Sequence, residues 1–171
     1  MYPSGLTGVC IPKLMRQASG CSSTYTLSGS DGRRHASGTK MPTDHRDVQV
    51  LIVDDQAAYR RAARSVVELT PGFVVAGEAH TGEAAVDTTR EKMPDLVLMD
   101  VHLPGIDGLE ACRRILAASD GKRPVIFLLS TYDAAEYTAE LRECGAAAYL
   151  TKLEFGSERL ATVWAAATAS A

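Results

Sequence analysis

The sequence predicts an α/β fold in which helices cover both faces of a five-stranded parallel sheet. From about residue 48 onward, short apolar runs rich in β-branched residues alternate with longer segments of helical periodicity, five times over. This alternation is typical of a doubly wound parallel sheet. The runs are apolar on both faces, which indicates strands buried between layers of helices. The chain has 171 residues, enough for one domain of ordinary size and an appendage.

Residues 1–47 are expected to form a disordered extension ahead of a folded domain at residues 48–171. The stretch is rich in Gly, Ser, Thr and Pro and lacks a sustained helical or strand period, so it cannot bury enough apolar surface to offset its ordering entropy. Three alternatives stay open. One is an organellar transit peptide, since residues 1–30 contain no acid. Another is a functional arm that uses Arg33 and Arg34, and the third is that translation starts at Met41.

Charge is unevenly distributed along the chain. Residues 1–47 carry six Lys and Arg against three Asp and Glu, whereas residues 48–171 carry 12 against 18. The net charges of the two parts are therefore +3 and −6, in agreement with −3 for the whole chain. Affinity for phosphate backbones requires clustered Lys and Arg, and the folded part at residues 48–171 is acidic instead. We therefore expect no direct nucleic-acid binding by this chain.

The expected location is the cytoplasm. No apolar stretch approaches the length of a membrane span, and residues 1–20 lack the continuous apolar core of a secretory signal. The four cysteines show neither Cys-x-x-Cys pairing nor His partners at zinc spacing, which argues against a zinc knuckle or a disulfide framework. They are Cys10, Cys21, Cys112 and Cys144. A reducing compartment is the simplest assumption for such free thiols.

The alternating pattern places each strand and helix approximately. Strands are expected at about Gln49–Val53, Phe73–Gly77, Leu96–Met99, Val125–Leu129 and Ala147–Leu150. Helices are expected at about Gln56–Leu69, from Thr81 to Lys92, from Asp107 through Leu116, from Asp133 through Cys144, and from Ser157 onward. Thr81, Asp107 and Asp133 are suitable N-cap residues. In the first helix the apolar stripe comprises Tyr59, Ala62, Ala63 and Val66, and a solvated face carries Arg60, Arg61 and Arg64.

Five polar side chains follow the expected strands. Asp54 and Asp55 follow the first strand, Asp100 the third, Ser130 the fourth and Lys152 the fifth. In an open parallel sheet, the ligand crevice lies outside the carboxyl ends of the strands. If the first and third strands are neighbours, the carboxylates converge, and two of them about 4 Å apart repel by about 4 kcal/mol at an effective dielectric of about 20. A hard divalent cation relieves this repulsion, and Mg²⁺ suits a site with few protein ligands better than Ca²⁺.

The same groups fit phosphoryl transfer to an aspartate. Lys152 would place an ammonium where it pairs with Asp100 or with a phosphoryl oxygen, and Ser130 offers a hydroxyl donor. Such a transition state needs in-line positioning and charge neutralisation, so Asp100 is the predicted phosphoacceptor. Individually the acids have simpler explanations, since Asp55 could cap the following helix and Asp100 could be a turn residue.

From Val48 to about Ser170 the sequence resembles the receiver domain of two-component response regulators. The motifs that carry the resemblance are VLIVDDQ at 50–56, LVLMDVHLPGIDG at 96–108, FLLST at 127–131 and GAAAYLTK at 145–152. The resemblance implies a flavodoxin-like (βα)5 fold with strand order 2-1-3-4-5. It also implies a signalling phosphoacceptor rather than an enzyme: a phosphoryl group from a sensor histidine kinase or phosphotransfer protein would be accepted on Asp100.

The resemblance assigns roles to further residues. Mg²⁺ would be held by Asp54, Asp55, Asp100 and the backbone carbonyl of His102, and Ser130 and Lys152 would bind the phosphoryl oxygens. Tyr149 matches the switch aromatic whose rotamer follows the Ser130 hydroxyl, although a core aromatic with a wet hydroxyl is an equal alternative. The surface that changes would comprise the predicted fourth helix, the fifth strand and the last helix, and it would contact a downstream protein or a second copy of the chain.

The chain departs from the family pattern in three places. Leu153 stands where many receivers have a cis proline, Thr131 replaces a small residue, and His102 and Tyr132 are bulky at positions that tune the lifetime of the aspartyl phosphate. We expect slow self-hydrolysis. The motifs look most like receivers joined to a helix-turn-helix output domain, but 19 residues follow Lys152, so we expect either a stand-alone receiver or a fragment of a longer regulator.

Three other functions compete with this interpretation. A Mg²⁺-dependent phosphatase or phosphotransferase of the haloacid dehalogenase type requires an acid two residues after the nucleophile, where this chain has His102. A flavodoxin-like cofactor binder requires a loop rich in Ser, Thr and Gly after the first strand, and Asp54 and Asp55 would repel its anionic ligand. A pseudo-receiver that only binds partners is disfavoured by the complete acid set and by Lys152.

Overall fold

A parallel five-stranded sheet forms the centre of the domain in the computed structural model, which describes residues 46–119, 121–132 and 143–169. The strands are β1 (Val48–Val53), β2 (Phe73–Ala79), β3 (Leu96–Asp100), β4 (Val125–Ser130) and β5 (Ala148–Thr151). They lie in the order β2-β1-β3-β4-β5, and every neighbouring pair is parallel. This confirms the predicted fold class and strand order. The predicted disordered extension lies outside the described residues, apart from Arg46 and Asp47.

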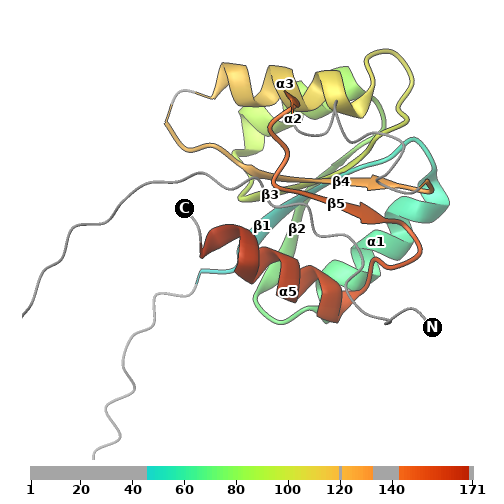
Figure 1. Ribbon diagram of the computed structural model, residues 1–171, viewed down its shortest axis with the longest axis vertical. Coiled ribbons are helices and arrows are strands. Elements are labelled where there is room, and N and C mark those ends of the chain that lie inside the picture. Colours follow the sequence, from blue (N-terminus) through green and yellow to red (C-terminus); the bar gives the residue numbers. More distant parts are fainter. Residues whose placement is uncertain (1–45, 120, 133–142, 170–171) are drawn as a thin grey trace, which may run out of the picture. The chain divides into compact units, whose positions relative to one another are not determined.

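The helices form two layers, one on each face of the sheet (Figure 1). They are α1 (Ala57–Leu69), α2 (Gly82–Lys92), α3 (Gly108–Ala118) and α5 (Ser157–Thr168). Helices α1 and α5 cover one face, and α2 and α3 cover the other (Figure 1). The helix expected from Asp133 falls largely on residues 133–142, which lie outside the described part of the chain. Every helix in the described part is too short or too polar to span a bilayer.

Alternating residues along each strand pack into two apolar clusters, one on each face of the sheet. In β1, Leu51 and Val53 pack with α2 and α3, whereas Val50 and Ile52 pack with α1 and α5. This alternation follows from the two-residue period of a strand, which sends successive side chains to opposite faces. Strands β3 and β4 are buried almost throughout, as predicted, but the edge strand β2 is only partly buried. The prediction that the strands are buried is therefore wrong for most of β2, at one edge of the sheet, whereas β5, at the other edge, is mostly buried.

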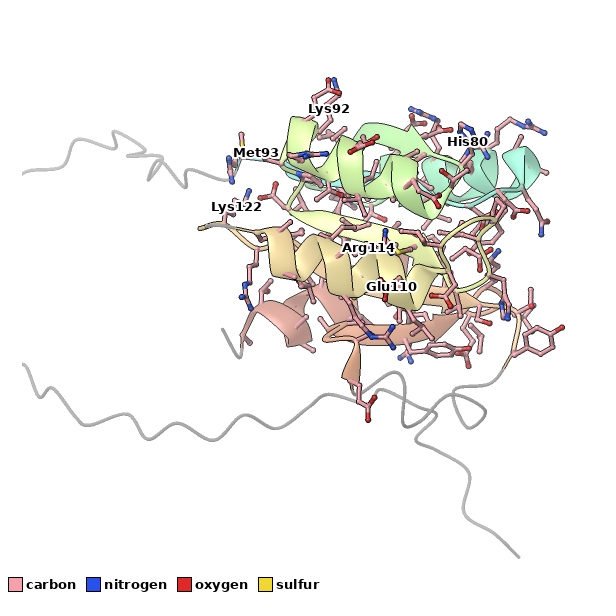
Figure 2. All side chains as sticks on the ribbon, turned by 90° about the horizontal axis from the view of Figure 1, so that it is seen from above. His80, Lys92, Met93, Glu110, Arg114 and Lys122 are labelled. Carbon is pink, nitrogen blue, oxygen red and sulfur yellow. The ribbon has the colours of Figure 1, made fainter. Side chains whose placement is uncertain are left out.

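Two of the predicted helix caps are confirmed. The Thr81 hydroxyl accepts a hydrogen bond from the amide of Ala84 at 3.1 Å, and the Asp107 carboxylate accepts one from the amide of Glu110 at 2.7 Å. Each side chain satisfies one of the free amides of a first helical turn. Figure 2 looks onto α2 and α3, where Glu110 and Arg114 extend outward from α3 and form an ion pair with 2.8 Å between Nε and Oε1.

Helix α1 differs from its prediction at its start and on its polar face. Gln56 is the N-cap residue and makes no side-chain cap, so the alternative in which Asp55 caps this helix is wrong. Ala62, expected on the apolar stripe, is exposed, and Val67 is buried instead. The arginines do not form a purely solvated face either. Arg60 and Arg64 both pair with Glu78 on β2, at 3.2 and 2.6 Å, and only Arg61 is fully exposed among the three.

Candidate functional site

The carboxyl ends of β1 and β3 bring two aspartates together. Val53 pairs with Met99 in the sheet, so the next residues along each strand, Asp54 and Asp100, emerge side by side. Both are almost completely buried, with exposed fractions of 1% and 3%. Asp55, one residue further along, is exposed. Strand order alone therefore explains why residues 46 positions apart share one rim of the domain.

These three aspartates form a cluster suited to a cation. One carboxylate oxygen from each of Asp54, Asp55 and Asp100 lies within 4.8 Å of the other two. All the donors are oxygens, which hard divalent ions such as Mg²⁺ prefer. The buried pair supplies fixed ligands, and the exposed Asp55 leaves one side open to water, as Mg²⁺ requires because it keeps several waters. The donor set therefore fits Mg²⁺.

Lys152 bridges the two buried acids. Its Nζ lies 2.6 Å from Asp54 Oδ2 and 2.9 Å from Asp100 Oδ2, and its side chain is only 10% exposed. The amide of Lys152 donates to the carbonyl of Ser130 at 2.7 Å, which extends the pairing of β4 and β5 and directs the side chain to this rim. Charge-assisted bonds of this kind are roughly twice as strong as neutral ones.

The site shifts the ionisation of its members. Burial raises the pKa of Asp100 above its usual value, and the neighbouring Asp54 charge adds to this, whereas Lys152 and the His102 amide act in the opposite direction. For Lys152, burial acts to lower the pKa, but the hydrogen bonds and charges of Asp54 and Asp100 outweigh it and raise the pKa overall. The ammonium is therefore charged at neutral pH and compensates part of the buried negative charge.

Arg60 fixes the loop that carries Asp54 and Asp55. Its guanidinium donates to the backbone carbonyl of Asp54 at 2.7 Å and to that of Asp55 at 3.2 Å, while its Nε donates to Glu78 at 3.2 Å. The Asp54 carboxylate also accepts a hydrogen bond from the amide of Gln56 at 2.8 Å. Sequence reasoning missed this role of Arg60, because helical periodicity reports which face a residue occupies and not which carbonyls it reaches.

The loop after β3 is held tightly against Asp100. The amide of Gly108 donates to the carbonyl of Val101 at 2.9 Å, and a Cβ at Gly108 would lie 2.1 Å from the carbonyl oxygen of Asp100. Only glycine permits so close an approach. Glu83 at the start of α2 accepts a hydrogen bond from the amide of Ile106 at 3.0 Å. The loop that carries His102 is thus fixed at both ends.

Ser130 and Tyr149 both bond to the backbone of Tyr132. The Ser130 hydroxyl is buried and accepts a hydrogen bond from the amide of Tyr132 at 3.1 Å. The Tyr149 hydroxyl donates to the carbonyl of Tyr132 at 2.7 Å, and Tyr149 is 4% exposed. The ring of Tyr132 in turn packs edge-on against His102, with 5.5 Å between ring centroids. The His102 amide donates a hydrogen bond to Asp100 Oδ1 at 3.3 Å, and a metal-binding role for the His102 carbonyl stays a prediction.

The family follows from comparison with known proteins. A family model described as the response regulator receiver domain matches residues 50–164. The chain belongs to the response regulator receiver family. Receiver domains of response regulators are signalling modules of two-component systems, and the acidic cluster at the end of β1 and β3 fits this family.

Individual relatives of this receiver domain are moderately similar. Response regulator UvrY of Escherichia coli strain K12 is 39% identical over 105 residues, which are 61% of this chain and 47% of that protein. Protein-glutamate methylesterase/protein-glutamine glutaminase of Alkalilimnicola ehrlichii is 37% identical over 106 residues, 61% of this chain and 27% of that protein. The chain thus spans less than half of the length of either relative.

Solved structures agree with the fold of the receiver domain. A two-component response regulator of the LuxR family from Aurantimonas sp. SI85-9A1 aligns with a TM-score of 0.65 and 29% identity. The alignment covers 72% of this chain and 86% of that chain. Together with the strand order, it establishes a CheY-like, flavodoxin-like receiver.

Proposed function

We propose that this receiver domain, at residues 48–171, accepts a phosphoryl group on Asp100 from a sensor histidine kinase or a phosphotransfer protein and passes the signal on through protein contacts. The observation that carries the proposal is the bridging of Asp54 and Asp100 by the ammonium of Lys152 beside the three-carboxylate cluster. A nucleophilic carboxylate, an oxygen-only cation site and a buried cation at one rim are what phosphoryl transfer to an aspartate requires.

Mg²⁺ is the proposed cofactor. Asp54, Asp55 and Asp100 would hold it, with the backbone carbonyl of His102 as a further ligand. When bound, the ion neutralises charge on the transferring phosphoryl group and on the acids around it. Because three carboxylates and one ammonium carry a net charge of −2, a divalent cation balances the charge of the site before the phosphoryl donor arrives.

The protein groups around Asp100 have complementary tasks. The His102 amide donates to Asp100 Oδ1 and Lys152 donates to Oδ2, so the carboxylate is held in one orientation. Lys152 and Ser130 would bind the incoming phosphoryl oxygens. The Ser130 hydroxyl accepts from the Tyr132 amide, which leaves its own O–H proton free for donation.

The signal would leave the site through Tyr132 and Tyr149. Ser130 and Tyr149 both bond to the backbone of Tyr132, so a movement of the Ser130 hydroxyl toward a phosphoryl group reaches Tyr149 through one residue. Two charge-assisted bonds at roughly 1.5 to 3 kcal/mol each would shift a two-state equilibrium by roughly two to four decades. The surface of the predicted fourth helix, β5 and α5 is the proposed contact for a downstream protein or a second copy.

The phosphoryl group is expected to be long-lived. His102 and Tyr132 pack against each other beside Asp100, and Tyr132 is bonded to Ser130 through its amide. Two bulky rings restrict the approach of water to the acyl phosphate. A half-life of seconds for the phosphorylated protein would contradict this expectation.

Phosphoryl labelling tests the proposal. Purified protein is incubated with Mg²⁺ and either acetyl phosphate or a phospho-histidine donor, and bound phosphate is quantified by intact-protein mass spectrometry. We expect one equivalent of hydroxylamine-sensitive phosphate on the wild type and none on Asp100→Asn, whereas the exposed-residue control Asp87→Asn labels normally. Stoichiometric labelling of Asp100→Asn would show that another residue is the nucleophile.

A further inference from the structure

The ammonium of Lys152 contacts a third group in addition to Asp54 and Asp100, the ring of Tyr59. Lys152 Nζ lies 4.5 Å from the ring centroid of Tyr59, over the face of the ring, in addition to its bonds to Asp54 and Asp100. An aromatic face carries negative potential and attracts a cation within about 6 Å, more strongly where water is excluded. The ammonium is thus held by two carboxylates and one aromatic face.

The ring of Tyr59, rather than its hydroxyl, makes this contact. Within the described part of the chain, the Tyr59 hydroxyl is buried and has no hydrogen-bond partner. Burial and the charges of Asp54 and Asp100 raise the pKa of Tyr59, so the side chain is a neutral phenol at physiological pH. A neutral ring keeps the full attraction of its face for a cation, and a phenylalanine ring would provide nearly the same face.

Tyr59 is fixed relative to the acids. It belongs to α1 and packs against the apolar cluster shared by α1 and α5. The loop between β1 and α1 is in turn fixed by Arg60, which donates to the carbonyls of Asp54 and Asp55. The ring is therefore a rigid support on the side of Lys152 that faces α1.

The contacts of Lys152 must change when the site is used. In the present structure Asp54 Oδ2 accepts from Lys152, yet Asp54 is also one of the three carboxylates that a cation would draw on. A divalent cation at Asp54 competes with the ammonium for that oxygen and repels it. Asp100 would then be the one remaining carboxylate partner of the ammonium, and a second attractive group on the far side would help to keep the ammonium from moving out toward water.

We propose that Tyr59 is a positioning residue, whose ring keeps the Lys152 ammonium beside Asp100 when a metal ion takes over Asp54. This inference rests on the proposed phosphoacceptor function, because Lys152 serves there as the group that binds phosphoryl oxygen. Tyr59 itself touches neither the acids through a hydrogen bond nor the phosphoryl group, and it acts through Lys152 alone.

The first test is spectroscopic and does not depend on phosphorylation. An aromatic face shifts the NMR signals of groups above it upfield, so the Lys152 side-chain methylene protons should be shifted in the wild type and in Tyr59→Phe but not in Tyr59→Leu. The shift should persist at saturating Mg²⁺. Loss of the shift when Mg²⁺ is added to the wild type would overturn the proposal, since the ammonium would then have left the ring.

The second test is the rate of phosphorylation by acetyl phosphate at saturating Mg²⁺. Tyr59→Leu should lower the rate constant roughly threefold to tenfold, in line with the strength of a partly buried cation–π contact, and Tyr59→Phe should keep most of the wild-type rate. Val66→Ala, on the same helix and against the same apolar cluster, controls for a general loosening of α1. An equal loss in Tyr59→Phe or in Val66→Ala would overturn the proposal.

The two tests separate this inference from the proposed function. If the wild type takes up no phosphate at all, the phosphoacceptor role fails, while the NMR shifts still report whether the ring holds Lys152. If the wild type is labelled and the shifts are absent, the role of Tyr59 fails and the phosphoacceptor role stands.

Discussion

Lys152 Nζ donates a hydrogen bond of 2.6 Å to Asp54 Oδ2, although the two residues are 98 positions apart in the chain. The same ammonium donates to Asp100 at 2.9 Å, so one cation compensates two buried carboxylates contributed by different strands. Partial compensation of this kind leaves the site strained by net negative charge and ready to accept a cation.

Lys152→Met should destabilise the domain by about 3 kcal/mol at pH 7, because it leaves two buried carboxylates without their counter-charge. The pKa of Lys152 is raised in the folded state, so its contribution is fully present at pH 7 and is lost only as the pH rises through that raised value. Urea denaturation measures the change. Lys122→Met removes an ion pair with Asp95 in which the Lys122 side chain is about half exposed, and Asp95 keeps Arg46 as a partner. The substitution should therefore cost under about 1 kcal/mol, and an equal loss in both variants would contradict the bridging role.

Asp100→Asn should stabilise the protein in the absence of Mg²⁺, by on the order of 1 kcal/mol at pH 7. The folded pKa of Asp100 is raised, mainly by burial, so the wild type loses stability as the pH rises from the ordinary carboxyl pKa of about 4 through the raised folded value. The advantage of the variant should therefore be small at the acid end of this window and grow toward neutrality. Thermal unfolding at several pH values checks this, and an advantage that grew on acidification would have the wrong sign.

Mg²⁺ should raise the unfolding temperature of the wild type, by the equivalent of about 1.4 kcal/mol at ten times its Kd. Asp55→Asn should reduce this shift strongly. Because Asp55 is exposed, the substitution should leave the metal-free stability nearly unchanged. The matched control is Asp87→Asn on α2, which is also exposed and lies outside the acid cluster. Indistinguishable Mg²⁺ shifts in the two variants would exclude Asp55 as a ligand.

Gly108→Ala should destabilise the domain by roughly 2 kcal/mol or more and slow phosphorylation of Asp100. The new methyl group would meet the Asp100 carbonyl oxygen at 2.1 Å, so the loop or the end of β3 has to move. Gly77→Ala is the comparison, since its Cβ would make ordinary contacts at 3.5 Å with Leu51 and Thr88. Calorimetry measures the loss of stability, and labelling with phosphate measures the loss of rate. If Gly108→Ala changed neither, the close approach of Gly108 to the Asp100 carbonyl would not matter.

The sequence predicts the fold well because the relevant signals are local. Alternating apolar runs, the caps at Thr81 and Asp107, and polar residues directly after strands are all visible within a few positions. They suffice for the order of elements, and the motif resemblance supplies the strand order. Strand ends are less accurate: β3 and β4 extend through Asp100 and Ser130, because ladder hydrogen bonds such as Val101 to Leu129 continue past the apolar run.

The parts that sequence reasoning missed depend on contacts between distant elements. The spacing of apolar residues in α1 indicates that Tyr59 is partly buried. It carries no information about the ammonium of Lys152, which lies over the Tyr59 ring because Lys152 follows β5. Arg60 is assigned to a solvated face for the same reason, since Glu78 approaches it from β2 only after the sheet has formed. The order of strands in the sheet is therefore a better guide to the partner of an isolated charge than helical periodicity is.

The distance in sequence between the acids and their ammonium has a consequence for biosynthesis. Strands β1 and β3 leave the ribosome well before β5, so a nascent chain that ends short of residue 152 carries Asp54 and Asp100 without the Lys152 ammonium that bridges them. In the absence of Mg²⁺, bringing those two carboxylates together is less favourable until translation has delivered Lys152. The domain should therefore fold late in synthesis and as one cooperative unit. The acid cluster would disfavour folding of a chain that still lacks Lys152.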